Sequence, residues 1–158
     1  MAFRKVISTI FLIIWMMVIF MFSNQDSITS QSNSDKFAES TINVVGTITG
    51  NDYSESQKND IVIKSRFLIR KTAHFILYFI LGIFVYITFN SYGLTNRIVF
   101  YSILFAFIYS TSDEFHQLFS DGRTFKILDI SIDIIGASLG ASFAYLIKRK
   151  SRKNLIFY

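Results

Sequence analysis

Four stretches of the chain are apolar and poor in charge, and polar segments separate them. They cover residues 6–22, 72–90, 97–119 and 127–147. As helices they would measure about 25–35 Å, close to the hydrocarbon thickness of a bilayer. The pattern predicts an all-α, polytopic membrane protein, with four transmembrane helices in a small bundle that forms a single domain over residues 1–158.

The first stretch follows a short tail with Arg4 and Lys5, so a cleaved signal peptide is the alternative interpretation. The stretch is longer than the apolar part of a usual signal peptide. The residues after it, Phe22-Ser23-Asn24-Gln25, do not form a small-x-small cleavage site. We therefore interpret residues 6–22 as a retained span.

Residues 23–70 form a long polar connection, which we predict to be an outer loop without a further span. Ser34 is a suitable N-cap, and the residues after it that recur at helical spacing are Phe37, Thr41, Val44, Val45 and Ile48. This spacing predicts a short amphipathic extracellular helix over residues 34–45, on the membrane or over the spans. A disordered loop is the alternative. Residues 61–68 are expected to lead helically into the second span.

Composition supports the membrane class, because 51% of the residues are hydrophobic and only 17% are charged. The chain has no Cys, which excludes disulfides and thiolate metal sites. The net charge of +5 is interpreted as contact with anionic lipid, so no nucleic-acid partner is expected. The basic run at residues 148–153 is accordingly an anchor to the bilayer.

Four spans place both ends of the chain on one side of the cell membrane. Lys and Arg residues divide equally between the two sides, so their number does not decide the orientation. The terminal tails carry their cations directly beside a span, with no acidic residue next to them. On that ground we predict a multi-pass protein with both termini in the cytoplasm. The basic residues between Lys64 and Lys71 count against this orientation.

Charged residues are concentrated in Ser112–Asp133, between the strongly apolar runs at residues 97–111 and 134–147. This is a costly arrangement near a membrane and suggests a function. Helical spacing places Lys71, His74 and Tyr78 on one face at the start of the second span. These residues and the charged residues of spans three and four belong to the same ends of their spans. We expect one pocket there, formed by Lys71, His74, Tyr78, Asp113, Glu114, Gln117, Arg123, Asp129 and Asp133.

Three chemistries suit this set of side chains. A histidine beside carboxylates suits acid–base catalysis, and the candidate catalytic residues are His74, Asp113 and Glu114. The candidate binding residues, of which Lys71 and Arg123 suit a phosphate or a carboxylate, are Lys71, Tyr78, Gln117, Arg123, Asp129 and Asp133. The carboxylates also suit a divalent cation such as magnesium or calcium. The sequence does not identify the cofactor. A structural network of ion pairs is the alternative to all three.

The order of these motifs resembles the VanZ-like family of bacterial membrane proteins. The resemblance covers nearly the whole chain, and it rests on Phe22-Ser23-Asn24-Gln25, Lys71, His74, Tyr78, Asp113, Glu114, Gln117, Arg123, Asp129, Gly136 and Gly140. The chain departs from the pattern at Asp121-Gly122, where the family usually has Pro-Gly. It also has Asp133 where Asn is usual, which adds a charge.

The resemblance implies a small polytopic protein associated with resistance to the glycopeptide teicoplanin. One reading is an enzyme that acts on a lipid-linked or cell-envelope substrate at the outer membrane face. A second is a non-enzymatic protein that binds a lipid head group or a lipophilic antibiotic. A third is a transporter, which would need to oligomerise, for example through the GxxxG pair Gly136 and Gly140. The residues alone leave these alternatives open.

Overall fold

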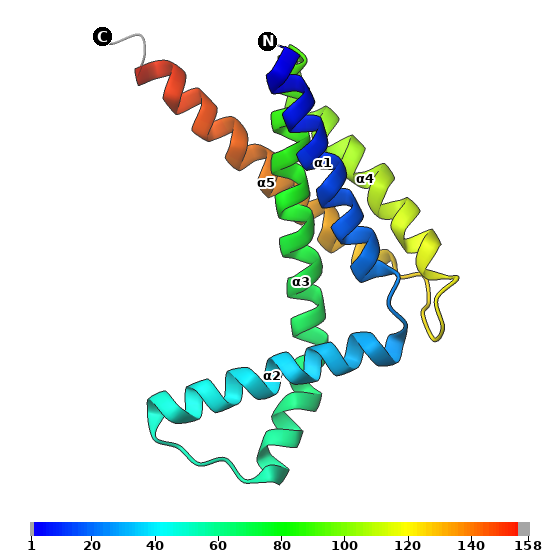
Figure 1. The fold of residues 1–158 in the computed structure, drawn as a ribbon, viewed down its shortest axis with the longest axis vertical. Helices are drawn as coiled ribbons and strands as arrows, with labels where there is room; N and C mark the ends of the chain where they lie inside the picture. Colours follow the sequence, from blue (N-terminus) through cyan, green and yellow to red (C-terminus); the bar gives the residue numbers. More distant parts are fainter. Residues whose placement is uncertain (1, 155–158) are drawn as a thin grey trace.

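The computed structural model describes residues 2–154 and contains five helices (Figure 1). They are α1 (Ala2–Ser23), α2 (Ser27–Thr49), α3 (Glu55–Ser91), α4 (Ile98–Gln117) and α5 (Ile127–Asn154). Four of them, α1, α3, α4 and α5, are long and apolar enough to cross a membrane. The described part of the chain has no strand. The predicted all-α fold with four spans is therefore confirmed.

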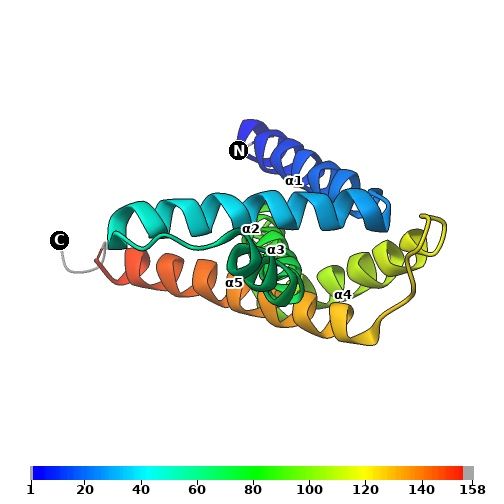
Figure 2. The same ribbon diagram turned by 90° about the horizontal axis from the view of Figure 1, so that it is seen from below.

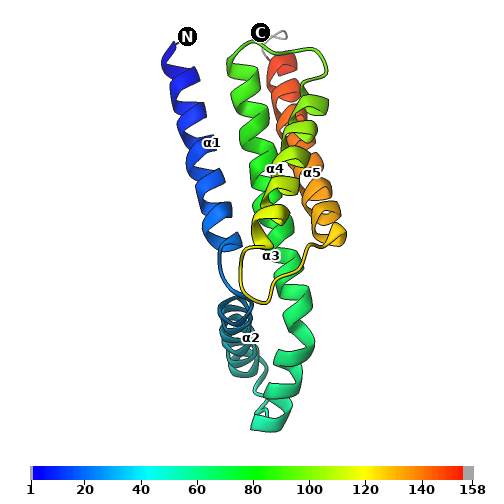
Figure 3. The ribbon, with the colours of Figure 1, turned by 90° about the vertical axis from the view of Figure 1, so that its right-hand side faces the viewer.

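Helix α3 is the centre of the fold, because every other helix packs against it. Its 37 residues would extend about 55 Å, well beyond the hydrocarbon core of a bilayer. The predicted span at 72–90 corresponds only to its second half. No Gly or Pro lies between Glu55 and Leu81, so nothing in the backbone ends the helix where the charged residues begin. The first half therefore projects out of the bundle (Figure 3).

Helix α2 begins earlier than the sequence pattern suggested. The side chain of Asp26 caps it by accepting the backbone N–H of Thr29 at 2.6 Å, and this hydrogen bond lowers the pKa of Asp26. The predicted N-cap, Ser34, was wrong: it is buried within the helix, and its hydroxyl donates to the carbonyl of Ser30. An earlier and equally good capping residue therefore adds about two turns to the helix.

Helix α2 runs across α3 rather than along it (Figures 1 and 2). A small core of Ala38, Ile42 and Val62 joins the two helices. Beside it, Arg66 donates two hydrogen bonds, of 2.6 and 2.8 Å, to the carboxylate of Asp35. Helix α2 also has exposed apolar side chains, which include Phe37, Val44 and Ile48. A helix that lies across the spans and exposes apolar residues has the features of an interfacial helix.

Glycines bring α5 into direct contact with the backbone of α3. Gly136 faces the carbonyl of Phe75, and a Cβ atom added at Gly136 would lie 2.6 Å from that oxygen. Gly140 faces the carbonyl of Phe79 in the same way. The glycine face that the sequence offered for oligomerisation thus packs against α3 of the same chain. This close crossing brings the acidic residues at the start of α5 to the face of α3 that carries His74.

Candidate functional site

Two acidic residues of α5 engage the basic face of α3. Lys71 forms an ion pair with Asp129, and their side chains are 13% and 5% exposed. One turn further along each helix, the Nδ1 atom of His74 lies 3.3 Å from the Oδ1 atom of Asp133. The other oxygen of Asp133 accepts a 2.7 Å hydrogen bond from the hydroxyl of Ser110 on α4. The site is thus built where three of the spans meet.

The loop between α4 and α5 is fixed by a carboxylate at the end of α4. The backbone N–H of Lys126 donates a 2.8 Å hydrogen bond to Oε2 of Glu114. The loop turns at Gly122, whose φ of 69° favours glycine. Glu114 is 1% exposed, and its Oε1 has no hydrogen-bond partner among the described residues. The visible contact of Glu114 therefore orders the loop that carries Arg123.

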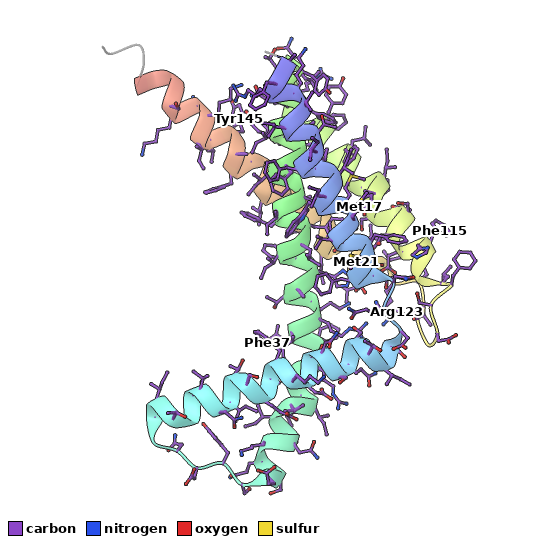
Figure 4. All side chains as sticks on the ribbon, viewed as in Figure 1. Met17, Met21, Phe37, Phe115, Arg123 and Tyr145 are labelled. Carbon is purple, nitrogen blue, oxygen red and sulfur yellow. The ribbon has the colours of Figure 1, made fainter. Side chains whose placement is uncertain are left out.

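Arg123 links this loop to two other parts of the chain. Its Nε donates to the carbonyl of Gln25 at 3.1 Å, and its Nη1 donates to Oε1 of Gln117 at 2.8 Å. The amide nitrogen of Gln117 in turn donates to Asp113 at 3.2 Å. Figure 4 shows Arg123 between α2 and the ends of α1 and α4. The guanidinium group is therefore held in a fixed position beside the connection from α1 to α2.

A cavity of about 280 Å³ opens beside these residues, between α1, α2, α3 and the end of α4. Much of its wall is apolar and includes Ile19, Phe22, Phe37, Ile69 and Leu77. The ionisable side chains that line it are Arg70, His74, Tyr78, Asp113 and Arg123. A cavity of this composition suits a ligand with an apolar part and a small charged part.

The structure brings the nine predicted residues to one end of the bundle but divides them into two groups. His74, Tyr78, Asp113 and Arg123 line the cavity. The other five lie outside its wall, in contacts between the helices and the loop, and they are Lys71, Glu114, Gln117, Asp129 and Asp133. Of the three candidate catalytic residues, His74 and Asp113 are therefore the ones placed to meet a ligand.

Arg70 lines the cavity but was not among the predicted site residues. It is partly buried, and its side chain forms no hydrogen bond or ion pair with any described residue. Helical spacing could have identified Arg70 as a site residue, because Arg70, His74 and Tyr78 recur every four residues along one face of α3. The predicted residue was its neighbour Lys71, whose side chain turns to Asp129.

The carboxylates contact protein groups rather than one another. Within residues 2–154, no group of three or more His, Asp or Glu side chains is arranged to hold a metal ion. Asp129 contacts Lys71, Asp133 contacts Ser110, and the partners of Asp113 and Glu114 are described above. The arrangement supports acid–base chemistry at His74 and the binding of an anion by guanidinium groups.

Comparison with known proteins places this architecture in a family. Searches of the curated proteins and of the solved structures found no match. A family model described as VanZ/LLP1 matches residues 8–148. The match runs from α1 into α5 and includes all nine predicted site residues, so this four-span protein belongs to the VanZ/LLP1 family.

Proposed function

We propose that this protein alters teicoplanin sensitivity by acting on a lipid-linked or cell-envelope molecule held in the cavity. Teicoplanin resistance is the general association of the VanZ family, to which the chain belongs. The observation that carries the proposal is the composition of the cavity, in which an apolar wall meets His74, Asp113 and two arginines. Such a wall fits an amphiphile whose reactive group lies at the boundary between lipid and water.

If the protein acts as an enzyme on this molecule, His74 transfers a proton to or from it. Asp133 lies beside its Nδ1 atom and is itself held by Ser110, and His74 lines the cavity, where its ring can meet a ligand. A positioned imidazole of this kind contributes about 10²–10⁴-fold to a rate. Asp113 faces the same cavity and supplies a second group able to exchange a proton.

The proposed orientation places both termini in the cytoplasm and the cavity at the outer face. The start of α1 and the end of α5 lie at the same end of the bundle, opposite α2 (Figure 3). These two ends carry basic residues, which favour the cytoplasmic side. An alkaline phosphatase fused after Tyr158 should therefore be inactive, whereas a fusion within the loop at residues 50–53 should be active. The reverse pattern would place the cavity inside the cell.

Expression in a susceptible Gram-positive host should lower susceptibility to teicoplanin modestly and change susceptibility to vancomycin little. Teicoplanin carries a fatty acyl tail that partitions into the outer leaflet, where each buried methylene contributes about 0.8 kcal/mol. A protein that acts on that surface affects the anchored drug more than the unanchored one. The measurement is the minimal inhibitory concentration of both drugs with and without expression. Equal protection against the two would contradict the lipid-based account.

A non-enzymatic binding role is the second candidate. The buried pair of Lys71 and Asp129, and the chain from Arg123 through Gln117 to Asp113, satisfy charges within the protein. A network of this kind stabilises a rigid site without requiring a reaction. In this role the protein binds a lipid head group or the lipophilic antibiotic itself. Substitution of His74, considered in the Discussion, separates the two candidates.

A further inference from the structure

We propose that the cavity binds the phosphate group of an anionic membrane lipid between Arg70 and Arg123. The inference deepens the proposed function, on which it rests, by naming the class of molecule that the cavity accepts. Arg70 and Arg123 come from α3 and from the loop after α4, and both line the cavity. Two guanidinium groups converging on one cavity match the geometry of a phosphate better than that of a neutral head group.

Arg70 is a cation whose side chain has no hydrogen-bond or ion-pair partner among the residues that the structure describes. Two acidic side chains of the site are engaged by other groups: Asp129 by Lys71 and Asp113 by Gln117. Arg70 is partly buried in the cavity wall and has no ion pair within residues 2–154. A partly buried cation without a counterion in the protein favours the binding of an anion. A bound phosphate supplies that anion.

Arg123 supports the same assignment from the other side of the cavity. Its hydrogen bonds to Gln25 and Gln117 use Nε and Nη1, so Nη2 remains for a ligand. Burial lowers the pKa of Arg123 and the positive charge of Arg70 lowers it further, whereas the carboxylates of Glu114, Asp113 and Asp26 act in the opposite direction. Both cations line the same cavity, where their like charges repel each other. An anion between them converts this repulsion into attraction.

The apolar wall indicates that the phosphate belongs to a lipid. The cavity wall also includes Ile19 and Phe22 of α1, Phe37 of α2 and Leu77 of α3. Helices α1 and α2 pack on α3 but not on each other in the described part of the chain. A hydrocarbon chain can thus leave the cavity between them and enter the bilayer. A volume of about 280 Å³ holds a head group and the first carbons of such a chain.

Native mass spectrometry of the full chain in detergent tests the inference, with dioleoyl phosphatidic acid as the probe and dioleoylglycerol as its phosphate-free counterpart. The wild-type protein should retain phosphatidic acid about tenfold more tightly than dioleoylglycerol. Arg70→Gln should lose about that factor. Arg70→Lys, which keeps the charge but not the planar fork, should bind with intermediate affinity. Lys64→Gln is the matched control, because Lys64 is on the same helix, 74% exposed and paired only with Asp60.

Equal retention of phosphatidic acid by the wild type, Arg70→Gln and Arg70→Lys would overturn the inference, as would an equal loss in Lys64→Gln. Displacement of the lipid by inorganic phosphate at the same concentration would overturn the assignment to a lipid. The assay contains no drug and no cell wall. Retained Arg70-dependent binding without teicoplanin protection would therefore overturn the proposed function alone. Protection without Arg70-dependent binding would overturn this inference alone.

Discussion

Replacing Lys71 by Met is expected to destabilise the protein by about 3–5 kcal/mol, because it leaves Asp129 as a buried carboxylate without its cation. Unfolding can be followed through Trp15, the single tryptophan. Its indole nitrogen donates to the carbonyl of Leu77 at 2.9 Å, so its fluorescence reports the packing of α1 on α3. The measurement is denaturant-induced unfolding in detergent micelles.

The double variant Lys71→Met, Asp129→Leu should recover most of that loss, because it removes both charges together. Lys58→Met is a matched control on the same helix. Lys58 pairs with Glu55, which is 90% exposed, so its loss should change stability little. A Lys71→Met variant as stable as Lys58→Met would show that the ion pair is not buried from water as the structure has it.

His74→Gln is expected to abolish teicoplanin protection if the protein transfers a proton. Glutamine has nearly the length of histidine and keeps a hydrogen-bonding group beside Asp133, but it cannot take up a proton. The loss of a general acid or base would lower the reaction rate about 10²–10⁴-fold. The measurement is the minimal inhibitory concentration of teicoplanin in strains with equal membrane levels of each variant.

His116→Gln is the control for this substitution, because His116 is the other of the two histidines in the chain. It is outside the cavity wall, and its Nε2 lies 3.2 Å from Oδ1 of Asn24. Protection should be unchanged in this variant. If His74→Gln also protects fully, proton transfer is contradicted, and the non-enzymatic binding role becomes the better account.

The spans were predictable because charge is costly in a bilayer, so each span appears as a run of apolar residues. The helix boundaries outside the bilayer follow other rules. Helix α3 begins at Glu55 because Ser54 and Gln57 form a capping box there, and hydropathy does not record such caps. Helix α2 begins after Asp26 for the same kind of reason.

The residues of the candidate site were predictable as a set. Which of them line the cavity and which form contacts between the helices was not predictable. Helical spacing identified the face of α3 that carries His74, and it contains Arg70 as well. Whether Arg70 or Lys71 turns to the cavity depends on the position of Asp129 across the glycine contact of α5 with α3. The position of Asp129 relative to α3 depends on how two helices far apart in the sequence pack, and local spacing does not record it. Asp133 adds a negative charge to the family pattern. Ser110 donates a hydrogen bond to one oxygen of this carboxylate, and His74 lies beside the other.

The uninterrupted course of α3 has a mechanical consequence. The helix that bears Ile69 and His74 in the cavity wall is the same rigid rod to which α2 is attached through Arg66 and Asp35. A rod without a hinge transmits any tilt from one end to the other. We therefore expect that, with α2 at the membrane surface, the depth of α2 sets the depth of the cavity relative to the lipid head groups. A thicker or thinner bilayer changes how the protein meets its lipids by tilting this rod.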